Sequence, residues 1–183
     1  MIIEKEKGCM GVAFNIAKYK GRYRTTFKEG NRIYNVFVDR DFEYPCFYEA
    51  ELKDYREVGN LIIKSYEFSG YLDRIPLLGR VYGVVIKKFN EEIKVKRDMI
   101  VKQDNTYMVL TTDDKLYCFC CSFVDDVNLN DIVKIDVIRK REDNKKLLYG
   151  VITKRYGFDE GLERISETYS IEEFFRNIED KRK

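Results

Sequence analysis

The feature of this sequence that most limits its possible folds is a two-residue alternation in residues 18–28. Cationic residues occupy nearly every even position of this segment, and aromatic residues occupy positions 19, 23 and 27. Side chains of a β-strand point alternately to its two faces, whereas those of a helix repeat about every 3.6 residues. The alternation therefore predicts a strand with one basic face and one aromatic face. We expect a small barrel to bury the aromatic face as core.

The rest of the chain contains further segments with the length and composition of strands, separated by polar residues typical of turns. Residues 29–31, Glu-Gly-Asn, predict a hairpin turn between the first two strands. Short strands at this spacing favour antiparallel barrels or sandwiches over alternating strand and helix units. The further predicted strands are residues 32–39, 47–55, 60–68, 80–89, 98–102, 106–112, 116–123, 132–139 and 147–156.

The second half of the chain contains a partial repeat of the first half. Residues 60–75 align without a gap on residues 150–165, with seven identical positions in sixteen. The remainder of the two halves does not align at this offset, so the match is either a duplication or chance. We favour a duplicated unit of roughly 75 to 90 residues. With Pro76 as the boundary, we predict a mostly β protein of two tandem small antiparallel β-barrels, residues 8–76 and 77–165.

The sequence predicts one helix, in a C-terminal segment of residues 166–183 that ends in a charged tail. Ser170 and Glu173 have the spacing of a capping box, and apolar residues follow at helical intervals. Such a helix either packs on its own domain or contacts a protein partner or a second copy of the chain. The residues that would make a partner contact are Phe174, Phe175 and Ile178.

The composition excludes several classes of function. The 34 Lys and Arg residues nearly balance the 32 Asp and Glu residues, so the net charge of +2 gives no whole-molecule attraction for nucleic acid or membranes. Histidine is absent, which removes Ser-His-Asp and Cys-His catalysis and His-ligated zinc. The sequence also lacks the glycine-rich phosphate-binding motifs and any apolar stretch long enough to span a membrane. We expect a non-catalytic intracellular protein without a cofactor.

The cysteines do not have the number or the spacing of a disulfide framework, so we expect reduced thiols. Three of them, Cys118, Cys120 and Cys121, suggest a zinc hypothesis, because thiolates bind zinc strongly. On a strand, however, Cys121 points away from the other two. We therefore expect these cysteines to be buried as small apolar side chains, with no metal site.

Residues 127–135 combine a loop, a polar residue, Asp131 and an alternating apolar strand, and a basic turn and a further strand follow. This arrangement resembles the last hairpin of OB-fold modules in replication protein A-like single-strand binders, with Asn130 in place of the usual glycine. The resemblance covers residues 116–156 well and the first half of the chain loosely. It implies an OB-like barrel in which residues 139–146 form a loop that closes over nucleic acid.

Two basic segments are the candidate contacts for nucleic acid. Residues 18–32 carry six cations against Glu29 alone, and residues 139–146 carry five cations against two acids. Phosphates are attracted to cations, and bases stack on aromatic rings, for which Tyr34 is our candidate. The candidate cations are Lys18, Lys20, Arg22, Arg24, Lys28, Arg32, Arg139, Lys140, Arg141, Lys145 and Lys146.

Two functions remain in competition on this sequence. The first is a non-catalytic protein that binds single-stranded DNA or RNA through the basic strand face and the basic hairpin loop. The alternative is a protein-interaction or assembly subunit of a larger complex with no direct nucleic-acid contact, in which the cations are solvated. The segregated basic segments favour the first function, and the near-neutral net charge favours the second.

Overall fold

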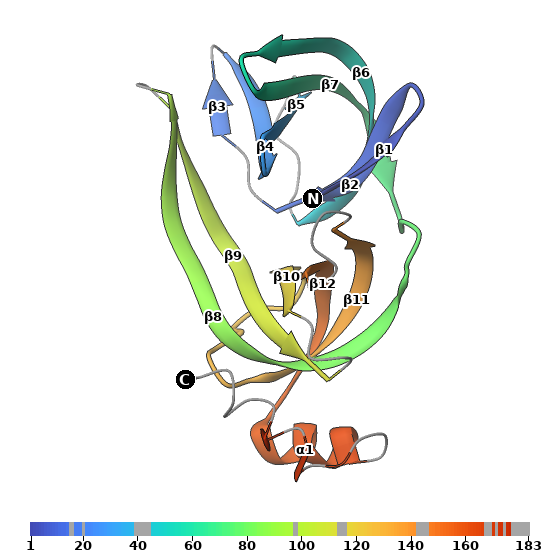
Figure 1. Cartoon of the computed structure of the whole chain (residues 1–183), viewed down its shortest axis with the longest axis vertical. Coiled ribbons are helices and arrows are strands. Elements are labelled where there is room, and N and C mark those ends of the chain that lie inside the picture. Colours follow the sequence, from blue (N-terminus) through green and yellow to red (C-terminus); the bar gives the residue numbers. More distant parts are fainter. Residues whose placement is uncertain are drawn as a thin grey trace. The chain divides into compact units, whose positions relative to one another are not determined.

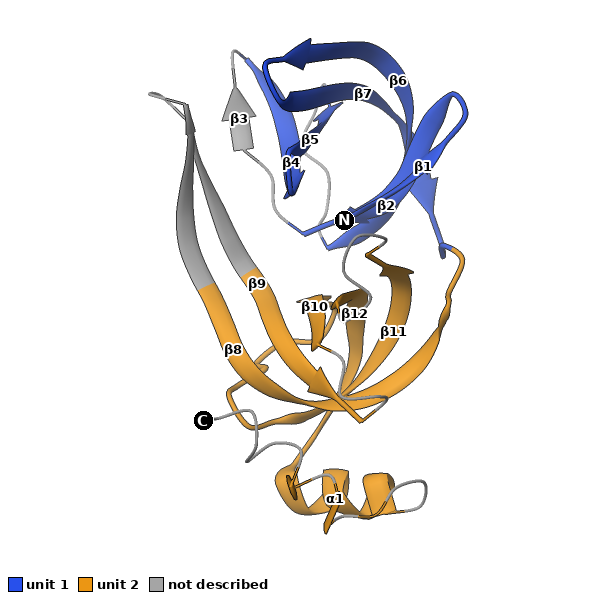
Figure 2. Cartoon of the chain, in the orientation of Figure 1, with its two compact units in different colours: residues 1–75, 90–104 blue, residues 76–89, 105–183 orange. Residues whose placement is uncertain are grey.

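A computed structural model shows a mostly β chain with a C-terminal helix, as the strand periodicity predicts (Figure 1). The chain divides into two compact units, unit 1 with residues 1–75 and 90–104 and unit 2 with residues 76–89 and 105–183 (Figure 2). Among the described residues, no helix has the length and apolar character needed to cross a membrane. The structure describes residues 1–14, 17–19, 21–38, 45–96, 99–112, 117–141, 147–166, 170, 172–173 and 175–176.

Unit 1 is built on a seven-stranded sheet with the strand order β1-β2-β6-β7-β5-β4-β3. Neighbouring strands are antiparallel except β5 and β7, which run parallel. Strands β2 and β3 are consecutive in sequence but lie at opposite ends of the set β6-β7-β5-β4. Strand β2 pairs with β6, and β3 pairs with β4. The strands are β1 Ile2–Lys5, β2 Gly8–Ala13, β3 Ala17–Tyr19, β4 Arg22–Glu29, β5 Arg32–Val38, β6 Cys46–Val58 and β7 Leu61–Leu72.

Unit 2 contains a closed five-stranded barrel with the strand order β10-β12-β11-β8-β9. Strand β10 pairs parallel with β12 and antiparallel with β9, and β11 pairs antiparallel with both β12 and β8. Helix α1 follows the last strand, and residues 172–173 and 175–176 are also helical. The bounds are β8 Gly79–Lys96, β9 Met99–Thr111, β10 Tyr117–Ser122, β11 Ile132–Lys140, β12 Leu147–Tyr156 and α1 Phe158–Ser166.

The two units follow one plan of strand pairing. Each unit has one parallel pair of strands, β5 with β7 and β10 with β12. In both pairs a residue lies opposite the residue thirty positions later in the sequence. The strand between them in sequence carries two irregularities, at 49/50 and 52/54 in β6 and at 134/135 and 137/139 in β11. Both irregularities in β11 lie 85 residues after those in β6. The two units therefore share the positions of these irregularities as well as the order of strand pairing. This supports a repeated structural unit.

The partial repeat in the sequence aligns two strands that are equivalent in the structure, but it aligns the wrong residues of those strands. It lies on β7 and β12, which occupy equivalent places in the two units. However, Ala50 pairs with Phe68, and the equivalent Ile135 pairs with Ile152. Phe68 therefore corresponds to Ile152, whereas the sequence alignment matched it to Phe158. The identities at the longer offset reflect a shared strand composition more than a shared position.

The prediction of purely antiparallel strands is wrong for one pair in each unit, β5 with β7 and β10 with β12. A parallel pair needs a long crossover between its strands, and here a whole strand, β6 or β11, supplies it. Local sequence reports each strand's own periodicity and not the direction of its neighbour. The closed barrel is shown for unit 2, while the sheet of unit 1 runs from β1 to β3.

Each unit has its own hydrophobic core. In unit 1, Tyr23 and Phe27 pack against a buried cluster that includes Val36 and Tyr66, as the aromatic face of the predicted strand requires. In unit 2 the cluster includes Cys118 and Cys120, which are fully buried. Burial raises the pKa of Cys121, also fully buried, to about 12. The expectation that these cysteines serve as small apolar side chains is confirmed.

Helix α1 packs directly on the barrel of unit 2 and was missed by the sequence analysis. Acidic Asp159 and Glu160 in its first turn suit the helix dipole. A Cβ atom added at Gly161 would lie 2.5 Å from the side chain of Ile132, and Ile165 is fully buried. The pattern was missed because α1 is short and begins two residues after a strand, so its apolar periodicity covers few positions.

Several strand limits differ from the predictions for local backbone reasons. The predicted strand 18–28 is divided at Gly21, whose φ of +78° suits a turn between β3 and β4. The predicted strands 98–102 and 106–112 form one strand, β9, which continues through Asn105 with a φ of +56°. Strands β1 and β2 were not predicted at all, because their residues show little alternation of apolar and polar side chains.

Candidate nucleic-acid interface

A row of side chains crosses four strands on the outer face of the barrel in unit 2. Met108 of β9 pairs with Phe119 of β10, Phe119 pairs with Tyr149 of β12, and Tyr149 pairs with Arg139 of β11. Sequence neighbours of the first three of these residues belong to the barrel core, namely Tyr107, Val109, Cys118, Cys120 and Leu148. Because successive residues of a strand point to opposite faces, the row faces away from that core.

The aromatic members of this row form a continuous chain of ring contacts. The ring centroids of Phe89 and Phe119 lie 5.6 Å apart, and those of Phe119 and Tyr149 lie 6.2 Å apart. Both distances fall in the range of favourable ring pairs. Phe89 and Phe119 are half-buried, while Tyr149 is buried at 5% exposure. We name Lys87, Phe89, Phe119, Tyr149 and Arg139 the aromatic row.

A cation stacks on each end of the aromatic row. The Lys87 Nζ atom lies 4.7 Å from the ring centroid of Phe89, and the Arg139 guanidinium lies 5.5 Å from that of Tyr149. Phe119 lies between the two end rings. None of the five residues is acidic, so the row presents two positive charges around three apolar faces. Cations beside accessible aromatic rings are the combination that binds single-stranded nucleic acid, and in this row the accessible rings are the half-buried Phe89 and Phe119.

The basic hairpin that the sequence singled out begins where the aromatic row ends. Arg139 and Lys140 are the last residues of β11, and Lys140 is exposed. The Arg141 N–H donates to the Leu147 carbonyl oxygen at 3.0 Å, which closes the base of the hairpin. Lys145 and Lys146 lie outside the described residues.

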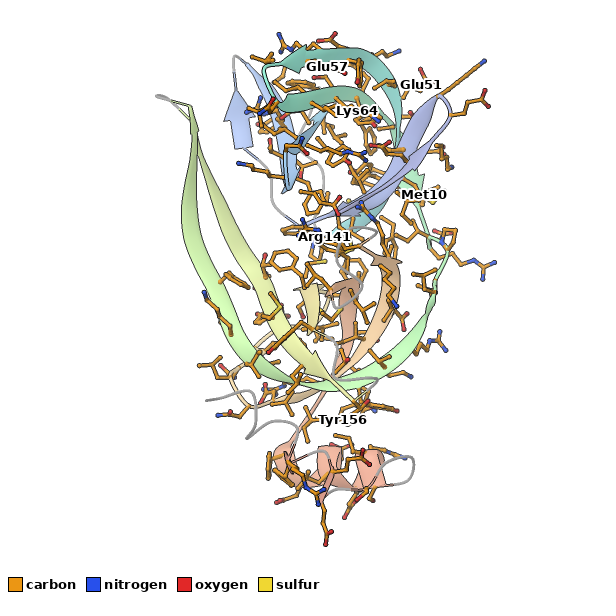
Figure 3. All side chains as sticks on the ribbon, viewed as in Figure 1. Met10, Glu51, Glu57, Lys64, Arg141 and Tyr156 are labelled. Atoms are coloured by element: carbon orange, nitrogen blue, oxygen red, sulfur yellow. The ribbon has the colours of Figure 1, made fainter. Side chains whose placement is uncertain are left out.

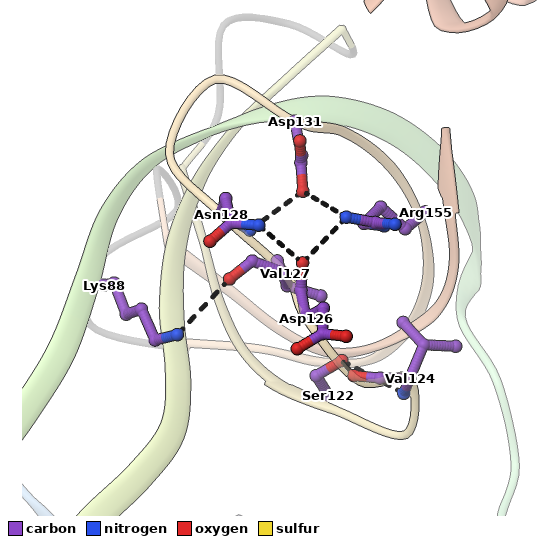
Figure 4. A network of polar contacts seen from close by, with 8 residues as sticks. All are labelled: Lys88, Ser122, Val124, Asp126, Val127, Asn128, Asp131 and Arg155. Carbon is purple, nitrogen blue, oxygen red and sulfur yellow. Dashed lines mark hydrogen bonds and ion pairs between the residues drawn. The ribbon is translucent and has the colours of Figure 1, made fainter. Parts of the chain in front are cut away.

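The loop before β11 is held by a network of polar contacts (Figure 4). The Asn128 N–H donates to Asp131 Oδ2 at 2.8 Å, and Arg155 donates to the Asp126 carbonyl at 2.9 Å and lies 3.7 Å from Asp131. Val127 is fully buried in the barrel core. Asn130 has a φ of +69°, a conformation that glycine and asparagine adopt most readily. This explains why asparagine can stand where the OB-like pattern has glycine.

The predicted basic stripe of unit 1 is only partly available to a ligand. Arg24 is buried at 7% exposure, so its charge is not displayed on a basic surface. Arg22 forms an ion pair with Glu67, which offsets its charge. Both guanidinium groups also stack on Phe37, at 5.5 Å and 5.8 Å from the ring centroid. Sequence alternation placed these residues on one face correctly, but the register brings Phe37 and Glu67 beside them.

Tyr34 is not the stacking surface that the sequence suggested. Its side chain is 1% exposed and belongs to the core of unit 1. Burial raises the pKa of Tyr34, although a hydrogen bond from Arg32 acts against this. Lys28 and Arg32 are exposed, as a binding role requires. The side chain of Lys18, and all of Lys20, lie outside the described residues.

Near Tyr34, a polar cluster ties the first hairpin to the sheet. Lys64 Nζ donates to Glu4 Oε2 at 2.6 Å and lies 5.9 Å from the ring centroid of Tyr55. Burial acts to raise the pKa of Glu4, but the hydrogen bond and charge of Lys64 outweigh it and hold that pKa below its usual value. The cluster therefore has a structural reason to exist, because it joins β1 to β7.

The C-terminal candidates are described only in part. The Glu173 N–H donates to Ser170 Oγ at 3.4 Å, which is the hydrogen bond of the predicted capping box. Phe175 packs on Phe158 of α1, with ring centroids 6.2 Å apart. Phe174 and Ile178, the other predicted contacts, lie outside the described residues.

The sequence analysis named one member of the aromatic row, Arg139, and missed the other four. Lys87, Phe89, Phe119 and Tyr149 come from three strands, and single-strand patterns do not show that they meet. The available signal was the alternation within β10, where an aromatic residue stands between two cysteines that point inward. No protein-family model matches the chain, and no curated protein matches its sequence.

Proposed function

We propose that the protein binds single-stranded nucleic acid, without catalysis, through the aromatic row of unit 2. The observation that carries the proposal is the chain of contacts from Lys87 through three rings to Arg139 on the outside of the barrel. Bases stack on aromatic faces with little regard to sequence, and phosphates are attracted to the flanking cations. The exposed Lys140 extends the same cationic end.

An OB-like barrel is the architecture that we propose for unit 2. The OB fold is a five-stranded Greek-key barrel that binds oligonucleotides on one strand face and its adjoining loops. Unit 2 has five strands in a closed barrel with one parallel pair, and its basic hairpin joins the fourth strand to the fifth. The aromatic row lies on the first, third, fifth and fourth strands of this barrel, with Lys87 and Phe89 on the first strand, β8. A ligand on this row would adjoin that hairpin.

We propose that unit 1 is also OB-like, with its first strand divided between β2 and β3. We propose further that unit 1 does not stack bases. The row of unit 1 equivalent to the aromatic row consists of Thr26, Asn35, Ser65 and Asp54. These side chains are polar, and Thr26 Oγ1 donates to Asn35 Oδ1 at 3.2 Å. We therefore propose base stacking for unit 2 alone.

Fluorescence anisotropy with labelled single strands of about 20 nucleotides, one of thymidines and one of uridines, tests the proposal. Phe119→Ala should weaken binding roughly 5- to 150-fold, since a stacked base is worth about 1 to 3 kcal/mol. The matched control is Phe158→Ala, which removes an equally large ring, 48% exposed, from α1. This control should bind as the unchanged protein does.

Salt dependence tests the role of the two cations. Each phosphate neutralised on a single strand contributes a slope of about −0.7 to the log-log plot of affinity against salt. Replacing Lys87 and Arg139 by alanine should reduce the slope by about 1.4 for every sequence alike, because phosphate contacts position a strand without specifying it. Absence of binding at low salt, or an unchanged affinity in Phe119→Ala, would overturn the proposal. The first outcome would favour the assembly-subunit alternative.

A further inference from the structure

The open edge of β6 carries the further inference, which is independent of nucleic-acid binding. Strand β2 pairs with β6 only up to Glu51, and the Leu52 N–H then donates to the Lys7 carbonyl oxygen at 3.1 Å. From residue 54 to residue 58, within the described chain, β6 pairs with β7 alone, and Lys53 lies at the irregularity between Leu52 and Asp54. All residues from Glu51 to Val58 are exposed, and Figure 3 labels Glu51, the first of them, and Glu57, the last but one. An edge of this kind presents unpaired backbone groups to a further strand.

Residues 52–58, Leu-Lys-Asp-Tyr-Arg-Glu-Val, are complementary to themselves when read in the opposite direction. With two copies antiparallel and Tyr55 opposite Tyr55, Asp54 of each copy faces Arg56 of the other. Beyond these pairs Glu57 faces Lys53, which lies at the irregularity between Leu52 and Asp54. Opposite charges and apolar pairs across antiparallel strands stabilise the pairing, and like charges directly opposite destabilise it.

Only this register satisfies the charges. A shift by one residue in one direction places Asp54 opposite Glu57, and a shift in the other direction places Lys53 opposite Arg56. The apolar side chains at the centre and ends of the segment are also exposed, with Leu52 at 37%, Tyr55 at 50% and Val58 at 55%. Pairing would therefore cover apolar surface as well as backbone groups.

The backbone of β6 allows this register. A turn at Gly59 and Asn60 joins β6 to β7, and Val58 and Leu61 are the first pair beyond it. In a hairpin closed by a two-residue turn the flanking pair is mutually hydrogen-bonded, so alternation directs the N–H and C=O groups of Tyr55 and Glu57 to the open edge. Two copies related by a two-fold axis at Tyr55 would thus exchange hydrogen bonds between their Tyr55 residues.

We propose that the protein forms a two-fold symmetric homodimer in which residues 53–58 of β6 pair antiparallel across Tyr55. A two-fold interface places the same patch of both copies in contact, and a self-complementary strand meets this requirement. Six residues of edge strand bury less area than a standard interface of about 1,600 Å², so the dimer is weak and concentration-dependent. If the chain did not dimerise, the charged side chains of this segment would instead serve to prevent the edge from pairing with another strand.

Sedimentation velocity from about 5 µM to about 500 µM, without nucleic acid, tests the proposal. The unchanged chain should pass from monomer to dimer in this range. Asp54→Arg places like charges opposite one another twice and should raise the dissociation constant roughly tenfold or more, and Arg56→Glu should do the same. Neither variant should unfold, because the pair of Asp54 and Arg56 within one chain is exposed and 3.8 Å apart.

Restoring complementarity gives the decisive measurement. The double variant Asp54→Arg with Arg56→Asp should dimerise as the unchanged chain does, and an equimolar mixture of the two single variants should form a heterodimer. Glu163→Lys, an exposed reversal on α1 with the same change of net charge as Asp54→Arg, should leave the dimer intact. A monomer at all concentrations, or a dimer that is indifferent to both single reversals, would overturn the proposal.

Discussion

Replacing Gly161 by alanine should destabilise unit 2, although alanine is the better helix former. In an exposed helix interior this change gains about 1 kcal/mol. Here the new Cβ atom would lie 2.5 Å from Ile132 Cβ and 2.7 Å from both its Cγ2 and Cδ1 atoms. Ile132 is fully buried among Val84, Tyr156 and Ile165, so it has little room to move away.

Overpacking of a well-filled core costs about 1 to 3 kcal/mol, and a 2.5 Å approach to the Cβ atom of Ile132 belongs to the upper part of that range, about 2 to 3 kcal/mol, which exceeds the gain in helix propensity. We therefore expect a net loss of about 1 to 2 kcal/mol in the free energy of unfolding of unit 2. Urea denaturation followed by far-ultraviolet circular dichroism measures this loss, with the transition of unit 2 analysed by itself if the units unfold separately. The control is Gly157→Ala, because a Cβ added at Gly157 meets nothing within 4 Å.

A double-mutant cycle isolates the contact between α1 and β11. Ile132→Ala removes the Cγ2 and Cδ1 atoms that the new methyl group at position 161 would meet, so Gly161→Ala should cost less in that background than in the unchanged chain. If Gly161→Ala is as stable as the unchanged protein, or more stable, then Ile132 yields without cost and the reasoning is refuted.

Three further predictions follow from the described contacts. Lys64→Met removes the cation that holds the pKa of Glu4 down. A carboxyl group whose pKa is lowered by folding stabilises the fold above its unfolded pKa, and this stabilisation is lost as the pH falls. Acid unfolding should therefore begin at a higher pH in the variant than in the unchanged chain. An unshifted acid transition would contradict this. Cys121, whose pKa burial raises to about 12, should react with a disulfide reagent at about pH 8 only after denaturation, and rapid labelling of the folded chain would show otherwise. Phe175→Ala should lower the free energy of unfolding by about 0.5 to 1.5 kcal/mol through loss of the ring pair with Phe158, as urea titration would show.

Strand type and helix capping could be read from the sequence because both depend on residues close together in the chain. The alternation around Tyr23 and Phe27 predicts a strand and names its buried side, and both residues pack on the core of unit 1. The pairing of Ser170 with Glu173 gives the capping hydrogen bond at the predicted residues. The partial repeat likewise identified β7 and β12 as equivalent strands.

The placement of charge and aromatic surface was decided by tertiary structure. Arg24 stands in a strongly basic segment and Tyr34 lies two residues after that segment, but sheet formation buries both. Phe89, Phe119 and Tyr149, by contrast, are far apart in sequence and contact one another only because the barrel brings their strands together. A strand's own pattern determines which residues share a face. Register and barrel closure decide which faces meet and which stay exposed, because they depend on pairing between distant segments.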